Sequence, residues 1–301
     1  MATLQEISDG LVATVEAAGA GVVEVRARRG RSATGIVWDK DHVLTSSHSI
    51  ENDEEITVAQ GDKEAKATVV GRDGGSDLAL LKVEGLGATP AERGSGADLK
   101  PGQLVLAIGR PGELQATFGA VVSTRSRQRG WQGSGAEGLV RTDAALFQGF
   151  SGGPLVDASG KVVAINSWYY GRGDTKALPI EAAARIAASL ATHGRVKQPY
   201  LGIGTQPVYL ADEVREAAGQ SSGLMVISVE AGSPAAAAGV LQGDTLVGIG
   251  GTSVEGMRDL YRALKGLEVG SKQTLQVIRA GEVKNLEVTV GERDQEGAPA
   301  E

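Results

Sequence analysis

The sequence of 301 residues contains no cysteine. This absence excludes disulfide bonds, catalysis by a thiolate and the common cysteine-based zinc sites. Histidine is also scarce, and the three residues of this type are His42, His48 and His193. Without cysteine they do not make up a metal-ligand set, so we expect neither a metal ion nor another cofactor.

Aromatic residues make up only 4% of the chain, so the cores must be built mainly from valine, leucine, isoleucine and alanine. The formal net charge of -7 gives no basic surface that would attract nucleic acid, and we expect no nucleic-acid partner. No apolar run approaches the roughly 20 residues that a membrane-spanning helix needs. The sequence therefore predicts a protein without an integral membrane segment.

The first residues also lack the features of a secretory signal. No basic segment precedes an apolar one, and Glu6, Asp9 and Glu16 interrupt the apolar pattern. These observations predict a cytoplasmic protein. The alternative is a periplasmic or exported protein whose signal lies upstream of this sequence.

Short apolar stretches separated by glycine follow one another along the first two thirds of the chain, and the sequence holds 44 glycines. This spacing is typical of antiparallel β-barrels rather than of alternating strands and helices. Two helices are expected beside the strands, an amphipathic one over 4–18 and another over 181–193, which ends at Gly194. Residues 97–103 fit the connection between two barrels.

Three motifs carry side chains suited to nucleophilic catalysis. Ser151 lies in the glycine-rich segment 149–155, which requires a tight loop. His48 follows a short apolar run, and Asp77 opens the apolar segment 78–83. The order histidine, aspartate, serine is that of chymotrypsin-like proteases, whereas other folds arrange the same triad in other orders.

A serine hydroxyl needs a base to become a nucleophile, and imidazole is the side chain that accepts a proton near neutral pH. We therefore assign Ser151 as the nucleophile, His48 as the base and Asp77 as the residue that orients the imidazole. Asp73 is the alternative to Asp77, but it precedes two glycines and fits a turn. The other two histidines are expected to be structural.

These motifs, with Thr142-Asp143-Ala144-Ala145 and the segment from Ser233 to Gly250, resemble the HtrA family of trypsin-fold serine proteases over residues 20–291. The resemblance implies a mainly β fold, with a double six-stranded antiparallel β-barrel followed by a small α+β PDZ domain. In sequence order, the implied parts are an N-terminal amphipathic helix (1–20), a trypsin-like serine protease domain (21–195), a linker (196–199), the PDZ domain (200–292) and a disordered tail (293–301).

The resemblance also implies an activity and its partners. The chain would be an ATP-independent serine endopeptidase that hydrolyses unfolded or misfolded proteins, in quality control under stress. Its PDZ domain would bind apolar C-termini or extended peptides and regulate the protease. A homotrimer would form through the N-terminal region. The alternative is a chaperone-like or peptide-binding scaffold with weak or absent proteolysis, if Phe150, which replaces the family's asparagine, blocks the cleft.

Further site residues follow from the same resemblance. The oxyanion hole would consist of the amides of Gly149 and Ser151. An uncharged S1 pocket that prefers small or medium aliphatic residues would be formed by Ala145, Ile165, Asn166 and Ser167. The PDZ groove is assigned to Tyr200, Leu201, Gly202, Ile203, Met257, Leu260, Tyr261 and Leu264. Segments 126–138 and 168–175 would be mobile loops that govern assembly of the active site.

Overall fold

The computed structural model describes residues 3–28, 30–126, 138–171 and 175–293. The chain forms two compact units, Met1–Val196 and Lys197–Glu301. Most of the predicted loop 126–138, residues 172–174 of the second loop and all but the first residue of the predicted tail lie outside the described residues. No described helix has the length and apolar character needed to cross a membrane.

The first unit opens with helix α1 (Leu4–Gly19), which covers the helix expected over 4–18. Thr3 and Glu6 form a capping box at its start, in which each side chain accepts a hydrogen bond from the other residue's amide. Leu11 and Val15 pack against the core of the unit. Leu4, with 87% of its surface exposed, Ile7 and Val12 instead face solvent, so the helix keeps part of its apolar face uncovered.

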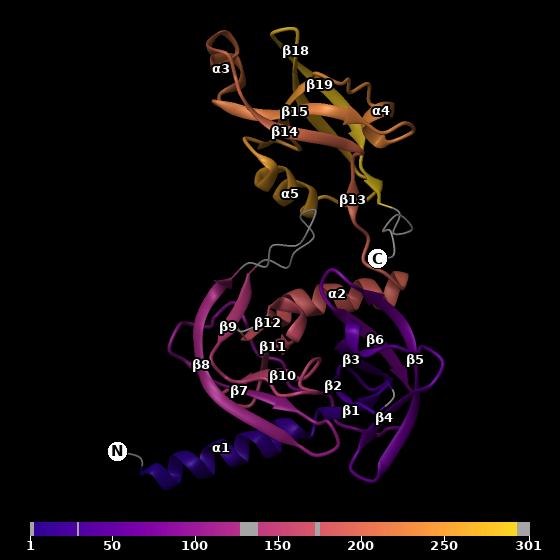
Figure 1. Ribbon diagram of the computed structural model, residues 1–301, viewed down its shortest axis with the longest axis vertical. Coiled ribbons are helices and arrows are strands. Elements are labelled where there is room, and N and C mark those ends of the chain that lie inside the picture. Colours follow the sequence, from indigo (N-terminus) through magenta and orange to yellow (C-terminus); the bar gives the residue numbers. More distant parts are fainter. Residues whose placement is uncertain (1–2, 29, 127–137, 172–174, 294–301) are drawn as a thin grey trace. The chain divides into compact units, whose positions relative to one another are not determined.

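Six antiparallel strands close the first barrel in the order β1-β2-β3-β6-β5-β4 (Figure 1). Its interior is lined mainly by aliphatic side chains, as the scarcity of aromatic residues requires. The strands are β1 (Val22–Arg26), β2 (Ala33–Val37), β3 (His42–Ser46), β4 (Ile56–Gln60), β5 (Lys63–Asp73) and β6 (Leu78–Val83).

A second closed barrel follows in the order β10-β11-β12-β9-β8-β7, so the predicted double six-stranded barrel is confirmed. Its strands are β7 (Leu104–Gly109), β8 (Gln115–Ser126), β9 (Leu139–Thr142), β10 (Pro154–Asp157), β11 (Val162–Asn166) and β12 (Thr175–Pro179). Strand β12 was not expected from the sequence, because Ala177 and Leu178 are its only buried residues and a helix begins directly after it.

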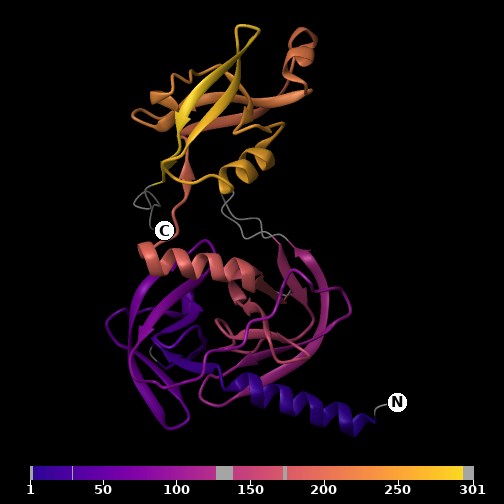
Figure 2. The same cartoon turned by 180° about the vertical axis from the view of Figure 1, so that it is seen from behind.

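Helix α2 (Ile180–His193) packs on strands of both barrels and lies across them in Figure 2. Its buried residue Leu190 shares one core cluster with Leu44 of the first barrel and Leu106 of the second. The helix ends at Gly194, whose φ of 70° is the left-handed conformation expected of a C-terminal glycine cap. The helix therefore ties the two barrels into one unit.

The second unit contains a sheet in which the strands follow the order β14-β15-β16-β18-β19, with β17 paired to β16 and a separate pair β13-β20. Its elements are β13 (Pro199–Tyr200), β14 (Ile203–Tyr209), α3 (Asp212–Ala218), β15 (Ser222–Val229), α4 (Pro234–Ala237), β16 (Thr245–Ile249), β17 (Thr252–Ser253), α5 (Met257–Lys265), β18 (Lys272–Arg279), β19 (Glu282–Thr289) and β20 (Gly291–Glu292). The segment 200–203, which was assigned to the PDZ groove, is divided between the end of β13 and the start of β14, and Gly202 between them has a φ of 78°. Helix α3 was not predicted.

Candidate active site

The pairing of β3 with β6 brings His48 and Asp77 together. Ser46 lies opposite Leu78 at the end of this ladder, so the turn η1 (Ser47–Ser49) after β3 faces the residue that precedes β6. His48 Nδ1 lies 2.8 Å from Asp77 Oδ2, and the His48 amide donates to Asp77 Oδ1 at 2.9 Å. One carboxylate therefore holds both the ring and the backbone of the histidine.

Asp77 is buried, with 2% of its surface exposed, and its φ of 53° is unusual for a residue other than glycine. Its surroundings hold it there: its carbonyl accepts from the Ser47 amide at 3.0 Å, and its Oδ2 also accepts from the Ser167 hydroxyl. Strained backbone of this kind persists where several contacts determine it, often at functional sites.

Tyr170 and Asp73 lie around Asp77, and the sequence did not reveal the part of Tyr170. The hydroxyl of Tyr170 donates to the carbonyl of Ser76, next to Asp77. Burial, together with the nearby carboxylates of Asp77 and Asp73, raises the pKa of this tyrosine well above its usual value, so it stays a neutral donor. Asp73 accepts from the Ser76 amide at 2.9 Å, as a turn residue does. Among the described residues it forms no hydrogen bond with His48.

The loop that carries Ser151 is shaped by its glycines. Gly149 and Gly152 have φ values of 87° and 84°. A Cβ at Gly149 would lie 2.5 Å from Pro111 Cβ, and one at Gly152 would lie 2.2 Å from the carbonyl oxygen of Thr34. The sequence pattern of a serine between glycines thus reflects both backbone conformation and close packing.

Thr34 of β2 joins this loop to the first barrel, a part that sequence reasoning missed. Its amide donates to the Ser151 carbonyl at 3.2 Å, and its hydroxyl donates to the Gly149 carbonyl at 2.6 Å. The same hydroxyl accepts from the Arg110 amide at 2.8 Å. A threonine within an apolar strand carries no signal for this role in a single sequence.

The two amides predicted to form the oxyanion hole have no acceptor within the described part of the chain, since neither Gly149 nor Ser151 appears there as a backbone donor. The Gly149 carbonyl is held by Thr34, and the intervening Phe150 amide donates to the Phe147 carbonyl at 3.1 Å. Both candidate amides are therefore available to a substrate oxygen.

Phe150 does not enter the cleft. Its side chain has 0% of its surface exposed and belongs to the core of the second barrel, where it makes an edge-to-face contact with Phe147. The blocked cleft on which the scaffold alternative depended is therefore not present.

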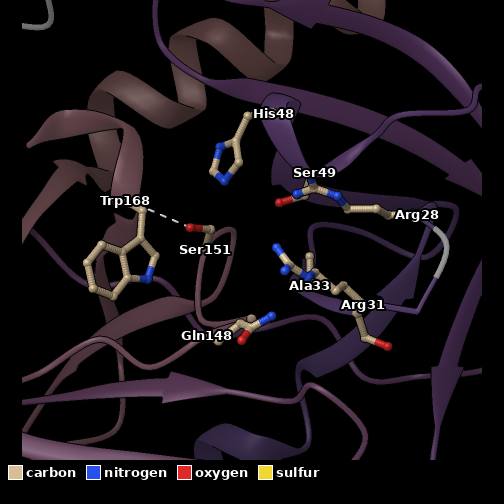
Figure 3. A pocket seen from close by; sticks show the side chains of 10 residues that line it. Arg28, Arg31, Ala33, His48, Ser49, Gln148, Ser151 and Trp168 are labelled. Atoms are coloured by element: carbon tan, nitrogen blue, oxygen red, sulfur yellow. Dashed lines mark hydrogen bonds between the residues drawn. The ribbon is translucent and has the colours of Figure 1, made fainter. Parts of the chain in front are cut away.

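Ser151 and His48 face one space from opposite barrels (Figure 3). The Ser151 Oγ accepts a hydrogen bond from the Trp168 amide at 3.2 Å, and the described residues show no hydrogen bond between this oxygen and the histidine ring. Catalytic hydrogen bonds often tighten only when substrate binds.

The space beside Ser151 is a cavity of about 340 Å³. The turn η1 contributes His48 and Ser49 to its lining. The loop before β10 contributes Gln148, Gly149 and Ser151, and Trp168 comes from the segment after β11. The connection between β1 and β2 contributes Arg28, Arg31, Ser32 and Ala33. Among the described residues, no group of three or more histidine, aspartate or glutamate side chains could hold a metal ion.

The four residues predicted for the S1 pocket do not line this cavity. Ala145 is exposed, Ile165 packs in the core between the barrels, and Ser167 donates to Asp77. Asn166 is fully buried, and its Nδ2 donates to the Pro154 carbonyl at 2.7 Å. Their assignment to a specificity pocket stays a prediction.

In the second unit, β14 is an edge strand of the sheet and α5 packs beside it. The predicted groove residues divide into two sets. Leu201 and Leu260 are buried in the core, whereas Ile203, Met257 and Leu264 are only partly buried. Tyr200 donates to Glu230, and Tyr261 is half-buried. The arrangement leaves an open strand edge next to a helix, as peptide binding by strand addition requires.

Comparison with known families agrees with this architecture. The model of a trypsin-like peptidase domain matches residues 33–165, and that of a PDZ domain matches residues 199–290. A variant of the HtrA-type protease AlgW solved with a decapeptide has a TM-score of 0.81 and 25% identity, covering 96% of this chain and 99% of that one. The serine endoprotease from Yersinia pestis has a TM-score of 0.77 and 26% identity, covering 93% and 97%.

The chain carries a trypsin-like peptidase domain followed by a PDZ domain, and its structure is similar to HtrA-type proteases over most of its length. A relative named probable periplasmic serine endoprotease DegP-like, from Pseudomonas fluorescens, is 35% identical over 268 residues, which are 86% of this chain and 56% of the relative. A protein of the same name from Halomonas elongata is 32% identical and covers 88% of this chain and 57% of its own length. The chain thus spans little more than half the length of these relatives.

The predicted cytoplasmic location is wrong, because these relatives are named periplasmic serine endoproteases. The prediction rested on the composition of the first residues alone. The basic and apolar segments that mark an exported protein belong to its signal peptide, which is removed on export, so the composition of other segments does not distinguish an exported protein from a cytoplasmic one.

Proposed function

We propose that this chain is an ATP-independent serine endopeptidase that cleaves unfolded or misfolded proteins in protein quality control. The observation that carries the proposal is the 2.8 Å contact between His48 Nδ1 and Asp77 Oδ2, with His48 and Ser151 on one cavity. A purely structural role for His48 would not explain why a buried carboxylate contacts one ring nitrogen and why the ring and Ser151 line the same cavity.

The chemistry follows from this arrangement. Ser151 Oγ attacks the carbonyl carbon of the peptide while His48 Nε2 takes the hydroxyl proton. Asp77 keeps the Nδ1 proton in place and stabilises the imidazolium, and the amides of Gly149 and Ser151 donate to the developing oxyanion. The imidazolium then gives its proton to the departing amine. Water repeats the sequence on the acyl-enzyme and restores the serine.

Substrate choice and regulation are part of the proposal. The uncharged S1 pocket at Ala145, Ile165, Asn166 and Ser167 would select small or medium aliphatic residues before the cut. Peptides with apolar C-termini would add to β14 beside α5 and regulate the protease. The exposed apolar residues of α1 support assembly of a homotrimer through the N-terminal region.

The test compares the wild type with Ser151→Ala on casein and on an unfolded protein, with and without a peptide that ends in an apolar residue. Loss of the nucleophile should lower turnover on the order of 10⁴–10⁶-fold, and the peptide should raise wild-type cleavage. A fluorophosphonate probe should label the wild type and not the variant. Equal cleavage by both proteins, or equal labelling, would overturn the assignment.

A further inference from the structure

Two arginines line the cavity beside Ser151, and the proposed function has given them no part. Arg28 and Arg31 come from the connection between β1 and β2, and both side chains extend toward the space in front of Ser151 (Figure 3). No aspartate or glutamate is among the residues that line the cavity. The cavity is therefore positively charged.

The charge is not cancelled by neighbouring carboxylates. Arg28 pairs with Glu51 at 2.6 Å, but Arg31 makes no ion pair with any described residue. Glu24 accepts from the hydroxyl of the cavity residue Ser32 and pairs at 2.7 Å with Arg26, which also pairs with Glu64. Arg31 therefore keeps a guanidinium that forms no ion pair with the described carboxylates, and this group is open to a ligand.

The position of the cavity relative to the nucleophile says which part of a substrate would meet this charge. The loop of Ser151 is flanked on one side by Asn166, whose carbonyl accepts from the Gly152 amide. On its other side it is flanked by the start of β2, through Thr34. A substrate crosses the serine from one flank to the other. The S1 pocket is proposed on the flank of Asn166, so the arginine flank receives the residues after the cut.

We propose that Arg31, assisted by Arg28, forms a subsite for a carboxylate that lies C-terminal to the scissile bond. The carboxylate is either an acidic side chain in the first positions after the cut or the terminal carboxylate of a short peptide. Arginine suits this part because its planar guanidinium binds a carboxylate through two parallel hydrogen bonds. This inference rests on the proposed endopeptidase function and names the substrate class of the same site.

The first experiment measures kcat/KM on internally quenched peptides with valine before the cut. One series is long and amidated, with aspartate, asparagine or lysine at each of the first three positions after the cut. A second series ends two or three residues after the cut, as the free acid or the amide. A side-chain subsite predicts that aspartate exceeds asparagine by roughly tenfold in the long series. A subsite for a terminal carboxylate predicts the same ratio between acid and amide in the short series only.

Variants then connect the preference to the arginines. Arg31→Gln should reduce the aspartate-to-asparagine ratio to near one, and Arg31→Glu should reverse it in favour of lysine. The control is Arg185→Gln, because Arg185 is an exposed arginine of α2 that does not line the cavity. This control should keep the wild-type ratio. Wild-type ratios near one in both series, or a ratio that survives the double change Arg28→Gln with Arg31→Gln, would overturn the proposal.

A binding measurement separates failure of this inference from failure of the proposed function. Fluorescent peptides, acidic and neutral after the cut, are titrated into Ser151→Ala and into Ser151→Ala with Arg31→Gln. The acidic peptide should bind the first protein more tightly than the neutral one, and the second should not distinguish them. If the wild type cleaves no peptide and is not labelled by the fluorophosphonate, the proposed protease function is wrong. If Ser151→Ala binds the acidic and the neutral peptide equally tightly, the proposed carboxylate subsite is wrong.

Discussion

Thr34 links the two barrels at the point where the candidate oxyanion hole is formed. Its hydroxyl donates to the Gly149 carbonyl and accepts from the Arg110 amide, and its amide donates to Ser151. The peptide that joins Gly149 to Phe150 therefore has its orientation held by a residue of β2. The Gly149 amide belongs to the preceding peptide, so this contact would restrain the candidate oxyanion donor through the backbone of Gly149.

Replacement of Thr34 by valine keeps the shape of the side chain and removes both hydroxyl contacts. We expect kcat to fall about tenfold, less than loss of an oxyanion donor itself, because the donor is displaced and not deleted. KM should change little, since the side chain does not line the cavity. Steady-state kinetics on one peptide substrate gives both values.

Thr34→Ser is the matched control for this prediction, because it keeps the hydroxyl and removes only a methyl group. It should retain most of the wild-type kcat. A serine variant as slow as the valine variant would show that packing, and not the hydrogen bond to Gly149, is what the threonine contributes.

At the scale of elements, an ion pair fastens the start of β16 to the end of β18. Asp244 is buried, and its two carboxylate oxygens accept from Arg279 Nε and Nη2, each at 2.7 Å. Burial alone would raise the pKa of Asp244, but the hydrogen bonds from Arg279 and from the Leu241 amide outweigh it and leave the pKa below its usual value. The folded state therefore favours the charged carboxylate.

The lowered pKa sets the sign of a pH dependence. The contribution of Asp244 to stability is complete above the ordinary aspartate pKa of about 3.9 and is lost as the pH falls through the lowered value. Asp244→Asn should thus lower the free energy of unfolding of the second unit by about 1–3 kcal/mol at neutral pH. The difference from the wild type should shrink in acid. Denaturant titrations at several pH values measure this difference in the free energy of unfolding. The control is Asp212→Asn, which removes an exposed ion pair with Arg215 in α3.

The sequence predicted elements best where pattern and backbone chemistry agree. The helices over 4–18 and 181–193 and most strands of the two barrels have a clear apolar pattern, and the glycines beside Ser151 have conformations and close contacts that favour glycine. Strand β12 and helix α3 were missed because few of their residues are buried, so their apolar pattern is weak. Thr34 and Tyr170 act through contacts between segments distant in the chain, which a single sequence does not encode as a motif.

At the scale of the whole molecule, each core cluster of described residues lies within one of the two units. The largest of these clusters joins both barrels with α2, and Leu190 is fully buried in it. The barrels therefore share a core, whereas the second unit has its own.

This division predicts the effect of two core substitutions. Leu190→Ala should destabilise the first unit by about 2–5 kcal/mol, because it leaves a cavity between the helix and the barrels. Leu224→Ala, at a buried site of the second unit, should act on that unit by a similar amount. Differential scanning calorimetry should show one transition shifted in each variant. Equal shifts of both transitions in either variant would contradict the separation of the cores.

The candidate triad is divided between the barrels, with His48 and Asp77 on the first and Ser151 on the second. The connection between them spans residues 84–103, from the end of β6 to the start of β7. Two fragments made by opening this connection would each carry an incomplete set of catalytic groups. Hydrolysis would then return only when the two fragments reassociate. The pair of fragments would thus act as a split-enzyme reporter, in which the rate of substrate hydrolysis reports association.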